Sequence, residues 1–127
     1  MSSIVGLGLD LVEVARIKAL LERHEERFLS RVCRPGEAKK GVSAEAWAQH
    51  VGGLFAAKEA VLKALGTGWA RGVTFRDVEV LHTSSGSPAI RLHGEAQRRA
   101  RALGANSVHL SITHERFHAA AVAILER

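Results

Sequence analysis

The first apolar segment of the chain alternates in a way that predicts a β-strand from Ser3 to Leu11. One face of this strand carries a valine and three leucines, and the other carries Ile4, Gly6, Gly8 and Asp10. Two residues without side chains allow another segment or a ligand to approach the second face closely. The strand therefore presents a carboxylate at the end of an open face.

From Glu13 onward the apolar spacing becomes helical. At about 100° per residue, one narrow arc holds Val14, Ile17, Leu21, Phe28 and Val32, and a separate arc holds Arg16, Arg23, Arg27, Arg31 and Arg34. This alignment assumes one continuous helix. Glu25 lies near the apolar arc, which favours a break around His24 to Glu26, and a break would misalign the two halves. Pro35-Gly36 then interrupts the pattern.

The longest predicted helix runs from Ser43, its N-cap, to Leu65, with Gly66 as the stop. Its expected core contacts are Trp47, Val51, Leu54, Phe55, Leu62 and Leu65. Gly52-Gly53 has poor helix propensity, so the pair indicates either a kink or close helix packing.

The rest of the chain predicts two hairpins around a short helix. The first joins strands at Asp77–His82 and Ala89–His93, the helix spans Glu95–Leu103, and the second hairpin joins Val108–Thr113 to Phe117–Leu125. The last strand is alanine-rich and apolar on both faces, which is typical of a central or interface strand. Without an internal repeat or linker, residues 1–127 are expected to form one α+β domain.

Composition narrows the functional classes. A net charge of +5 favours an anionic partner: a nucleic acid, a phosphorylated ligand or an acidic protein. Aromatic residues are only 5%, with no tyrosine, which argues against a surface that stacks nucleic-acid bases. The single cysteine, Cys33, excludes an internal disulfide framework. No signal peptide or membrane-spanning stretch is visible, so we expect a cytoplasmic protein without a membrane partner.

Two carboxylates are the main candidates for chemistry. Glu59 stands among apolar residues, and Lys63 follows four positions later, as in a helix-surface ion pair. An apolar neighbourhood makes a carboxylate seek a cation, which Lys63 or a metal would supply. Asp10 and Glu59 together would also provide two oxygen ligands for Mg²⁺. Spacing alone leaves both possibilities open.

Other motifs are less specific. Gly66-Thr67-Gly68 lacks the Lys-Ser/Thr of a Walker loop and fits a helix cap plus turn, although its amides could hold a phosphate. Gly6 and Gly8 lack the third glycine of a dinucleotide fingerprint. His114 and His118 are four apart in a predicted hairpin, so no zinc site follows.

Three segments taken in order carry a family resemblance: IVGLGLDLVEVARI at 4–17, FAAKEAVLKALGTG at 55–68 and HLSITHE at 109–115. They resemble the holo-[acyl-carrier-protein] synthases, the small trimeric branch of the 4′-phosphopantetheinyl transferases. The resemblance covers nearly the whole chain. It implies a 4′-phosphopantetheinyl transferase-like α+β fold, with an antiparallel sheet packed against a long helix and a homotrimeric assembly.

The resemblance also implies a reaction. Members transfer 4′-phosphopantetheine from coenzyme A to a serine of an acidic apo acyl carrier protein in fatty acid biosynthesis, with Mg²⁺, and release adenosine 3′,5′-bisphosphate. On this basis Asp10 and Glu59 would hold Mg²⁺, and Lys63 would neutralise phosphate charge. Glu59, directly or through water, would accept the serine proton, with Asp10 as the alternative.

The binding residues implied by the resemblance fall into two sets. Coenzyme A would contact Lys63, Gly66, Thr67, Gly68, Ser111, Thr113 and His114. The carrier protein would contact Arg16, Arg23, Arg27 and Arg31.

Some positions depart from the family pattern. Leu54 replaces a common arginine, which puts one anionic contact in doubt; Ser87 replaces a lysine, and Arg34 replaces a threonine. Two other functions remain as alternatives: a basic nucleic-acid-binding module, and a carrier-protein-binding subunit without the chemistry. The sequence does not name the carrier, whether of fatty acid or polyketide synthesis.

Overall fold

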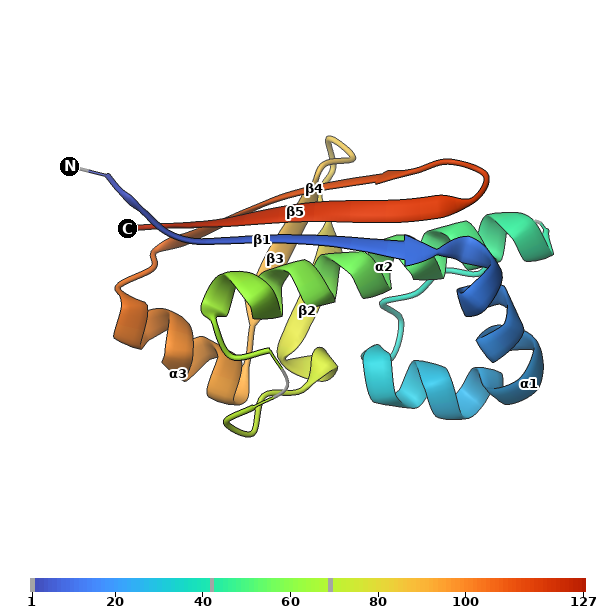
Figure 1. Cartoon of the computed structure of the whole chain (residues 1–127), viewed down its shortest axis with the longest axis horizontal. Coiled ribbons are helices and arrows are strands. Elements are labelled where there is room, and N and C mark those ends of the chain that lie inside the picture. Colours follow the sequence, from blue (N-terminus) through green and yellow to red (C-terminus); the bar gives the residue numbers. More distant parts are fainter. Residues whose placement is uncertain (1, 42, 69) are drawn as a thin grey trace.

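A computed structural model describes residues 2–41, 43–68 and 70–127 of the chain (Figure 1). The elements in order are β1 (Ile4–Glu13), α1 (Val14–Val32), α2 (Ala44–Leu65), the 3₁₀ turn η1 (Phe75–Asp77), β2 (Val78–His82), β3 (Pro88–Leu92), α3 (Gly94–Leu103), β4 (Ser107–His114) and β5 (His118–Glu126). Every predicted helix and strand is present, with ends displaced by a few residues. Asp77 belongs to the 3₁₀ turn rather than to β2.

The strands form two antiparallel sheets. One has three strands in the order β1-β5-β4, and the other pairs β2 with β3. Figure 1 shows α2 running along one face of the three-stranded sheet, with α1 and α3 toward opposite ends of the molecule. The α+β class and the antiparallel sheet packed on a long helix are thus confirmed. The alanine-rich β5 is the central strand, as its sequence predicts.

Glycines bring the main chain of β1 onto α2. A Cβ atom built at Gly8 would lie 1.8 Å from the carbonyl oxygen of Ala60, and one at Gly6 would lie 2.2 Å from that of Ala64. The open face of the first strand therefore receives α2. On the helix itself, a Cβ at Gly53 would lie 3.0 Å from Ile112, so this glycine allows close packing against β4.

Helix α1 breaks at His24, whose φ of −145° and ψ of 43° are not helical. Next to the break, Glu25 accepts a hydrogen bond from the indole Nε1 of Trp47 at 2.8 Å. The backbone angles of His24 confirm the predicted break. The hydrogen bond from Trp47 explains why the Glu25 carboxylate lies near the apolar side of the helix. The four arginines of α1 consequently do not continue a single stripe, because Arg27 and Arg31 lie beyond the break.

On the face of the three-stranded sheet opposite α2, strands β1 and β5 present apolar side chains that are exposed on β1 and partly exposed on β5. Leu7, Leu9 and Leu11 of β1 are 65%, 65% and 66% exposed. They pair across the sheet with Ile124, Val122 and Ala120 of β5. We call these six residues the leucine face. Within residues 2–41, 43–68 and 70–127, no helix is long and apolar enough to cross a membrane.

Candidate active site

The contact between β1 and α2 brings Asp10 and Lys63 together. Lys63 Nζ lies 3.0 Å from Asp10 Oδ1 and donates a second hydrogen bond to the main-chain oxygen of Leu9, also at 3.0 Å. The Asp10 side chain is only 13% exposed. The helix-surface pair that the sequence allowed between Glu59 and Lys63 is not formed, because the lysine reaches across to the strand instead.

Asp10 and Glu59 line the same pocket, of about 550 Å³. Its walls come from the end of β1, the first turns of α1, the middle of α2 and the start of β5: Asp10, Leu11, Val12, Glu13, Arg16, Ile17, Leu20, Phe55, Glu59 and His118. Three carboxylates, those of Asp10, Glu13 and Glu59, therefore share a cavity with one arginine and several apolar side chains. Of the four arginines proposed to dock a carrier protein, Arg16 is the one that lines it.

The charged form of the Glu59 carboxyl group is disfavoured in this pocket. Burial raises the pKa of this group above the ordinary value, and the charge of Asp10 raises it further, while Lys63 lowers it. In the described part of the chain no hydrogen-bond donor contacts the Glu59 carboxylate. A partly buried carboxylate beside a second one, without a donor, fits a cation-binding site.

The chemistry of the available ligands fits magnesium. Where the structure describes the chain, it has no group of three or more His, Cys, Asp or Glu side chains that could hold a metal ion. Mg²⁺ often binds through only one or two protein carboxylates, and water and substrate phosphates complete its shell. Asp10 and Glu59 are the residues that could hold it.

The proposed coenzyme A contacts separate into two groups. The first group, Gly66 to Gly68, lies just after the last turn of α2, which carries Lys63. Gly66 caps this helix with a φ of 74°, and Thr67 is buried. Ser111 and Thr113 lie on β4, where the strand register places them opposite Val122 and Ala120 of the leucine face. Asp10 is on the other face of the sheet. A single chain therefore does not bring Ser111 and Thr113 to the carboxylates, whereas His114, which pairs with Ala119, lies on the same face as Asp10.

The departures from the family pattern have structural roles. Leu54 is buried, at 2% exposure. Arg34 donates from Nε to the main-chain oxygen of Arg76 at 2.7 Å. Ser87 closes the β2–β3 turn, where its main-chain oxygen accepts from the Thr83 amide at 3.1 Å. The proposed metal ligands are unaffected by these three positions.

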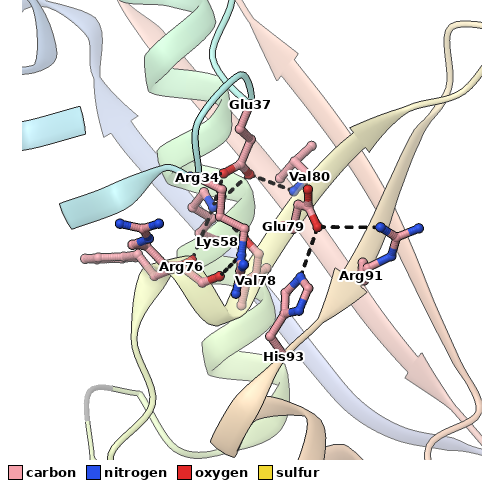
Figure 2. Close-up of polar contacts among 10 residues, drawn as sticks. Arg34, Glu37, Lys58, Arg76, Val78, Glu79, Val80, Arg91 and His93 are labelled. Atoms are coloured by element: carbon pink, nitrogen blue, oxygen red, sulfur yellow. Dashed lines mark hydrogen bonds and ion pairs between the residues drawn. The ribbon is translucent and has the colours of Figure 1, made fainter. Parts of the chain in front are cut away.

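The sequence analysis did not predict a buried ion pair between Lys58, which precedes Glu59 in α2, and Glu37. Lys58 is fully buried, and its Nζ lies 2.8 Å from Glu37 Oε2 and also donates to the main-chain oxygens of Phe75 and Val78 (Figure 2). Glu37 in turn accepts from the main-chain amides of Arg34 and Val80. The network fastens the loop after α1 to α2 and β2.

A sequence signal for Lys58 did exist. Leu54, Val51, Val61 and Leu65 lie three, four or seven residues from it, so this lysine occupies an apolar helix arc. Such a lysine is expected to be buried and paired. Its partner Glu37 lies in a loop, where no helical or strand periodicity predicts which side chains are buried.

This chain is similar to known proteins over most of its length. The 4'-phosphopantetheinyl transferase superfamily matches residues 6–122. A holo-[acyl-carrier-protein] synthase of Solidesulfovibrio magneticus is 51% identical, over 95% of this chain and 97% of the relative.

Solved structures are similar over almost the same length. The holo-ACP-synthase of Plasmodium yoelii superposes with a TM-score of 0.84 at 31% identity, covering 99% of this chain and 97% of that one. The Helicobacter pylori holo-[acyl-carrier-protein] synthase in complex with coenzyme A has a TM-score of 0.80 at 29% identity, with coverage of 94% and 98%. The family match extends over the β1 and α2 segments that carry Asp10 and Glu59. The chain therefore belongs to the holo-[acyl-carrier-protein] synthases of the 4′-phosphopantetheinyl transferase superfamily.

Proposed function

We propose that this chain moves 4′-phosphopantetheine from coenzyme A to a serine of an apo acyl carrier protein and releases adenosine 3′,5′-bisphosphate. The observation that carries the proposal is the pocket shared by Asp10 and Glu59, with Lys63 bound to Asp10 at its side. The coenzyme A complex of the Helicobacter pylori relative supports the donor. The names of the curated relatives support the acceptor.

The residues of the pocket suit phosphoryl transfer. The serine oxygen forms a bond to the β-phosphorus of coenzyme A, and the bond from that phosphorus to the bridging oxygen breaks, so that the electron pair leaves with the adenosine bisphosphate. This reaction depends on positioning and charge neutralisation more than on covalent catalysis. Bound Mg²⁺, held by Asp10 and Glu59, would neutralise pyrophosphate charge.

Proton transfer is assigned to Glu59. Because burial and Asp10 raise the pKa of this carboxyl group, its carboxylate is a stronger base than an ordinary glutamate. It would accept the serine proton directly or through one water. The Lys63 ammonium, which is half exposed beside Asp10, would stabilise negative charge on the phosphates.

The leucine face supports a homotrimer with active sites between subunits. Contiguous apolar surface of this kind marks an interaction site in a protein without a membrane partner. A neighbouring subunit on this face would also give Ser111 and Thr113 a ligand to contact, because both side chains point to that side of the sheet. The mass in solution by sedimentation equilibrium tests the assembly, and a monomer at micromolar concentration would refute it.

The basic residues of α1 support an acidic acceptor. Arg16 at the pocket, and Arg23, Arg27 and Arg31 farther along the helix, would attract an acidic carrier protein and orient its serine. We further propose that residues 1–127 act as a single domain, in the cytoplasm and in fatty acid biosynthesis. The buried, free Cys33 is compatible with a reducing compartment.

The decisive experiment is intact-mass analysis of an apo acyl carrier protein incubated with this protein, coenzyme A and Mg²⁺. The expected result is the gain of one phosphopantetheinyl group, lost in EDTA and in the Asp10→Ala and Glu59→Ala variants. No mass gain with several apo carriers that still bind the folded protein would refute the activity and favour a binding subunit. Salt-sensitive binding to unrelated duplexes, unchanged in both variants, would favour a nucleic-acid-binding module.

A further inference from the structure

The last turn of α2 contacts two other elements, β1 and α3, through consecutive carbonyl groups. The main chain of β1 lies against the Ala64 oxygen, which a Cβ atom built at Gly6 would approach to 2.2 Å. The next carbonyl is reached from α3, where Arg99 Nε donates a hydrogen bond to the main-chain oxygen of Leu65 at 2.9 Å. Figure 1 shows α3 beside this end of α2. A strand and a helix together therefore hold the end of α2.

Arg99 stands on the side of α3 that packs against the rest of the molecule. Ala96 and Ala100 on this side are buried, and Arg99 between them is partly buried. Its neighbour Arg98 is exposed and pairs with Glu95 of the same helix. Arg99 forms no ion pair within the described part of the chain and instead reaches the end of another helix. Its charge is thus directed at the C-terminus of α2.

An arginine suits this place because the end of a helix is electronegative. The last carbonyl groups of a helix have no partner within it, and the helix dipole places partial negative charge there. At the end of α2, the Lys63 oxygen accepts from the Gly66 amide at 3.0 Å, and the Leu65 oxygen accepts from Arg99. A hydrogen bond from a charged donor is stronger than one from a neutral donor. Arg99 is therefore a side-chain cap for α2 that comes from another helix.

The same turn of α2 carries the lysine of the active site. Lys63 Nζ lies 3.0 Å from Asp10 Oδ1 and 3.0 Å from the main-chain oxygen of Leu9, although its side chain is half exposed. A long side chain loses conformational freedom in such a contact, so the contact is favourable only while the backbone that carries the side chain is held in place. Arg99 holds this backbone at Leu65, two residues after the lysine.

We propose that Arg99 is a positioning residue, which holds the last turn of α2 through Leu65 and thereby places the Lys63 ammonium beside Asp10. The inference rests on the proposed function, in which Lys63 stabilises negative charge on the phosphates of coenzyme A. Arg99 acts through Lys63 and has no contact of its own with the substrate. Loss of its hydrogen bond should displace the lysine and slow the reaction while the fold persists.

Two substitutions separate the hydrogen bond from the rest of the side chain. Arg99→Leu removes the donor and keeps an apolar side chain, whereas Arg99→Gln puts an amide nitrogen as many bonds from the main chain as the arginine Nε. In steady-state kinetics, Arg99→Leu should lower kcat/KM for coenzyme A about tenfold and leave the KM for the carrier protein unchanged. Arg99→Gln should restore most of the activity. Arg98→Leu, the same change on the exposed side of α3, is the matched control and should behave as the unmodified protein.

A double-mutant cycle distinguishes positioning of Lys63 from general stabilisation. If Arg99 acts through Lys63, the effects of the two changes do not add. In a Lys63→Met protein, Arg99→Leu should then change kcat/KM by no more than about twofold. The same tenfold loss in both backgrounds would overturn the proposal, and so would equal losses in Arg99→Leu and Arg98→Leu.

A second readout is independent of activity and also decides the question if Lys63→Met is inactive. The ¹⁵N NMR signal of the Lys63 ammonium, assigned by its absence in Lys63→Met, reports the contact with Asp10. In Arg99→Leu this signal should move toward the position of exposed lysines, and in Arg98→Leu it should stay. An unchanged signal in Arg99→Leu would overturn the proposal. If the unmodified protein transfers nothing to any carrier, the proposed function fails, and the NMR signal still shows whether Arg99 positions the lysine.

Discussion

Lys63 Nζ lies 3.0 Å from Asp10 Oδ1, and this contact links the helix that carries Glu59 to the strand that carries Asp10. The lysine compensates the charge of one carboxylate and leaves the other without a hydrogen-bond donor among the described residues. Burial and the charge of Asp10 raise the pKa of the Glu59 carboxyl group. Asp10 is thus paired with Lys63, whereas the Glu59 carboxylate is left available for a cation.

Magnesium should stabilise the folded protein through Glu59. A carboxyl group whose pKa is raised on folding stabilises the protein only when protonated, and this contribution is lost as the pH rises through the folded-state pKa. At pH 7 without metal, Glu59→Gln should therefore raise the Tm. Mg²⁺ at 100 times its Kd should stabilise the unmodified protein by about 2.7 kcal/mol, and Glu59→Gln and Asp10→Asn much less.

Differential scanning fluorimetry with and without Mg²⁺ measures these shifts. Glu26→Gln, an exposed change on α1, is the matched control and should respond as the unmodified protein. An equal Mg²⁺ response in Glu59→Gln would exclude that residue as a ligand.

Arg16 should contribute to carrier-protein binding rather than to coenzyme A binding. Arg16→Glu reverses a charge at the rim of the carboxylate pocket, so it should raise the KM for the carrier protein about tenfold or more, with little change in the KM for coenzyme A. Arg101→Glu, at the end of α3, is the control. Steady-state kinetics with each substrate varied in turn measures both KM values. Equal effects of Arg16→Glu on the two KM values would contradict a role of Arg16 in carrier-protein binding.

Gly8 should not tolerate a side chain. Gly8→Ala places a Cβ 1.8 Å from the Ala60 carbonyl oxygen, a main-chain atom that has no room to move, and should prevent native packing of β1 on α2. Gly52→Ala is the matched case on the facing helix, because its Cβ would make an ordinary contact of 3.4 Å with Ala119. Better helix propensity should then stabilise the protein by up to about 1 kcal/mol. Urea unfolding compares the two, and a stable Gly8→Ala protein would contradict the packing described.

Breaking the buried pair of Lys58 and Glu37 should be costly. Lys58→Met leaves the Glu37 carboxylate buried without its cation, which should reduce the free energy of unfolding by about 3–5 kcal/mol. Lys18→Met breaks the exposed pair with Glu45 and should change stability little. Both values come from urea denaturation. If both variants lost a similar free energy of unfolding, burial of the Lys58 pair would not increase the cost of breaking it.

Local patterns predicted the elements well. Alternation located β1, helical spacing and the Ser43 cap located α2, and the awkward phase of Glu25 indicated the break at His24. The pairing of Asp10 with Glu59 needed the family resemblance, because nothing in the spacing of residues 49 apart places them together. The structure adds the physical reason, which is the glycine contact between β1 and α2.

Long-range partners left little trace in the sequence. Lys63 turned to Asp10 instead of to Glu59, because the close approach of β1 offered a partner across the chain. His50 and His82 became neighbours through the docking of the β2–β3 hairpin near α2, which no periodic pattern encodes. Glu37 found Lys58 from a loop in the same way.

The glycine contact also determines how the carboxylates tolerate change elsewhere. At Gly8, main-chain atoms of β1 rest on main-chain atoms of α2, with no side chain between them. The distance from strand to helix at this point is thus a property of the backbone. Substitutions that enlarge or shrink the remaining core can alter stability, yet the spacing between the strand of Asp10 and the helix of Glu59 should stay constant while the sheet and helix remain in contact.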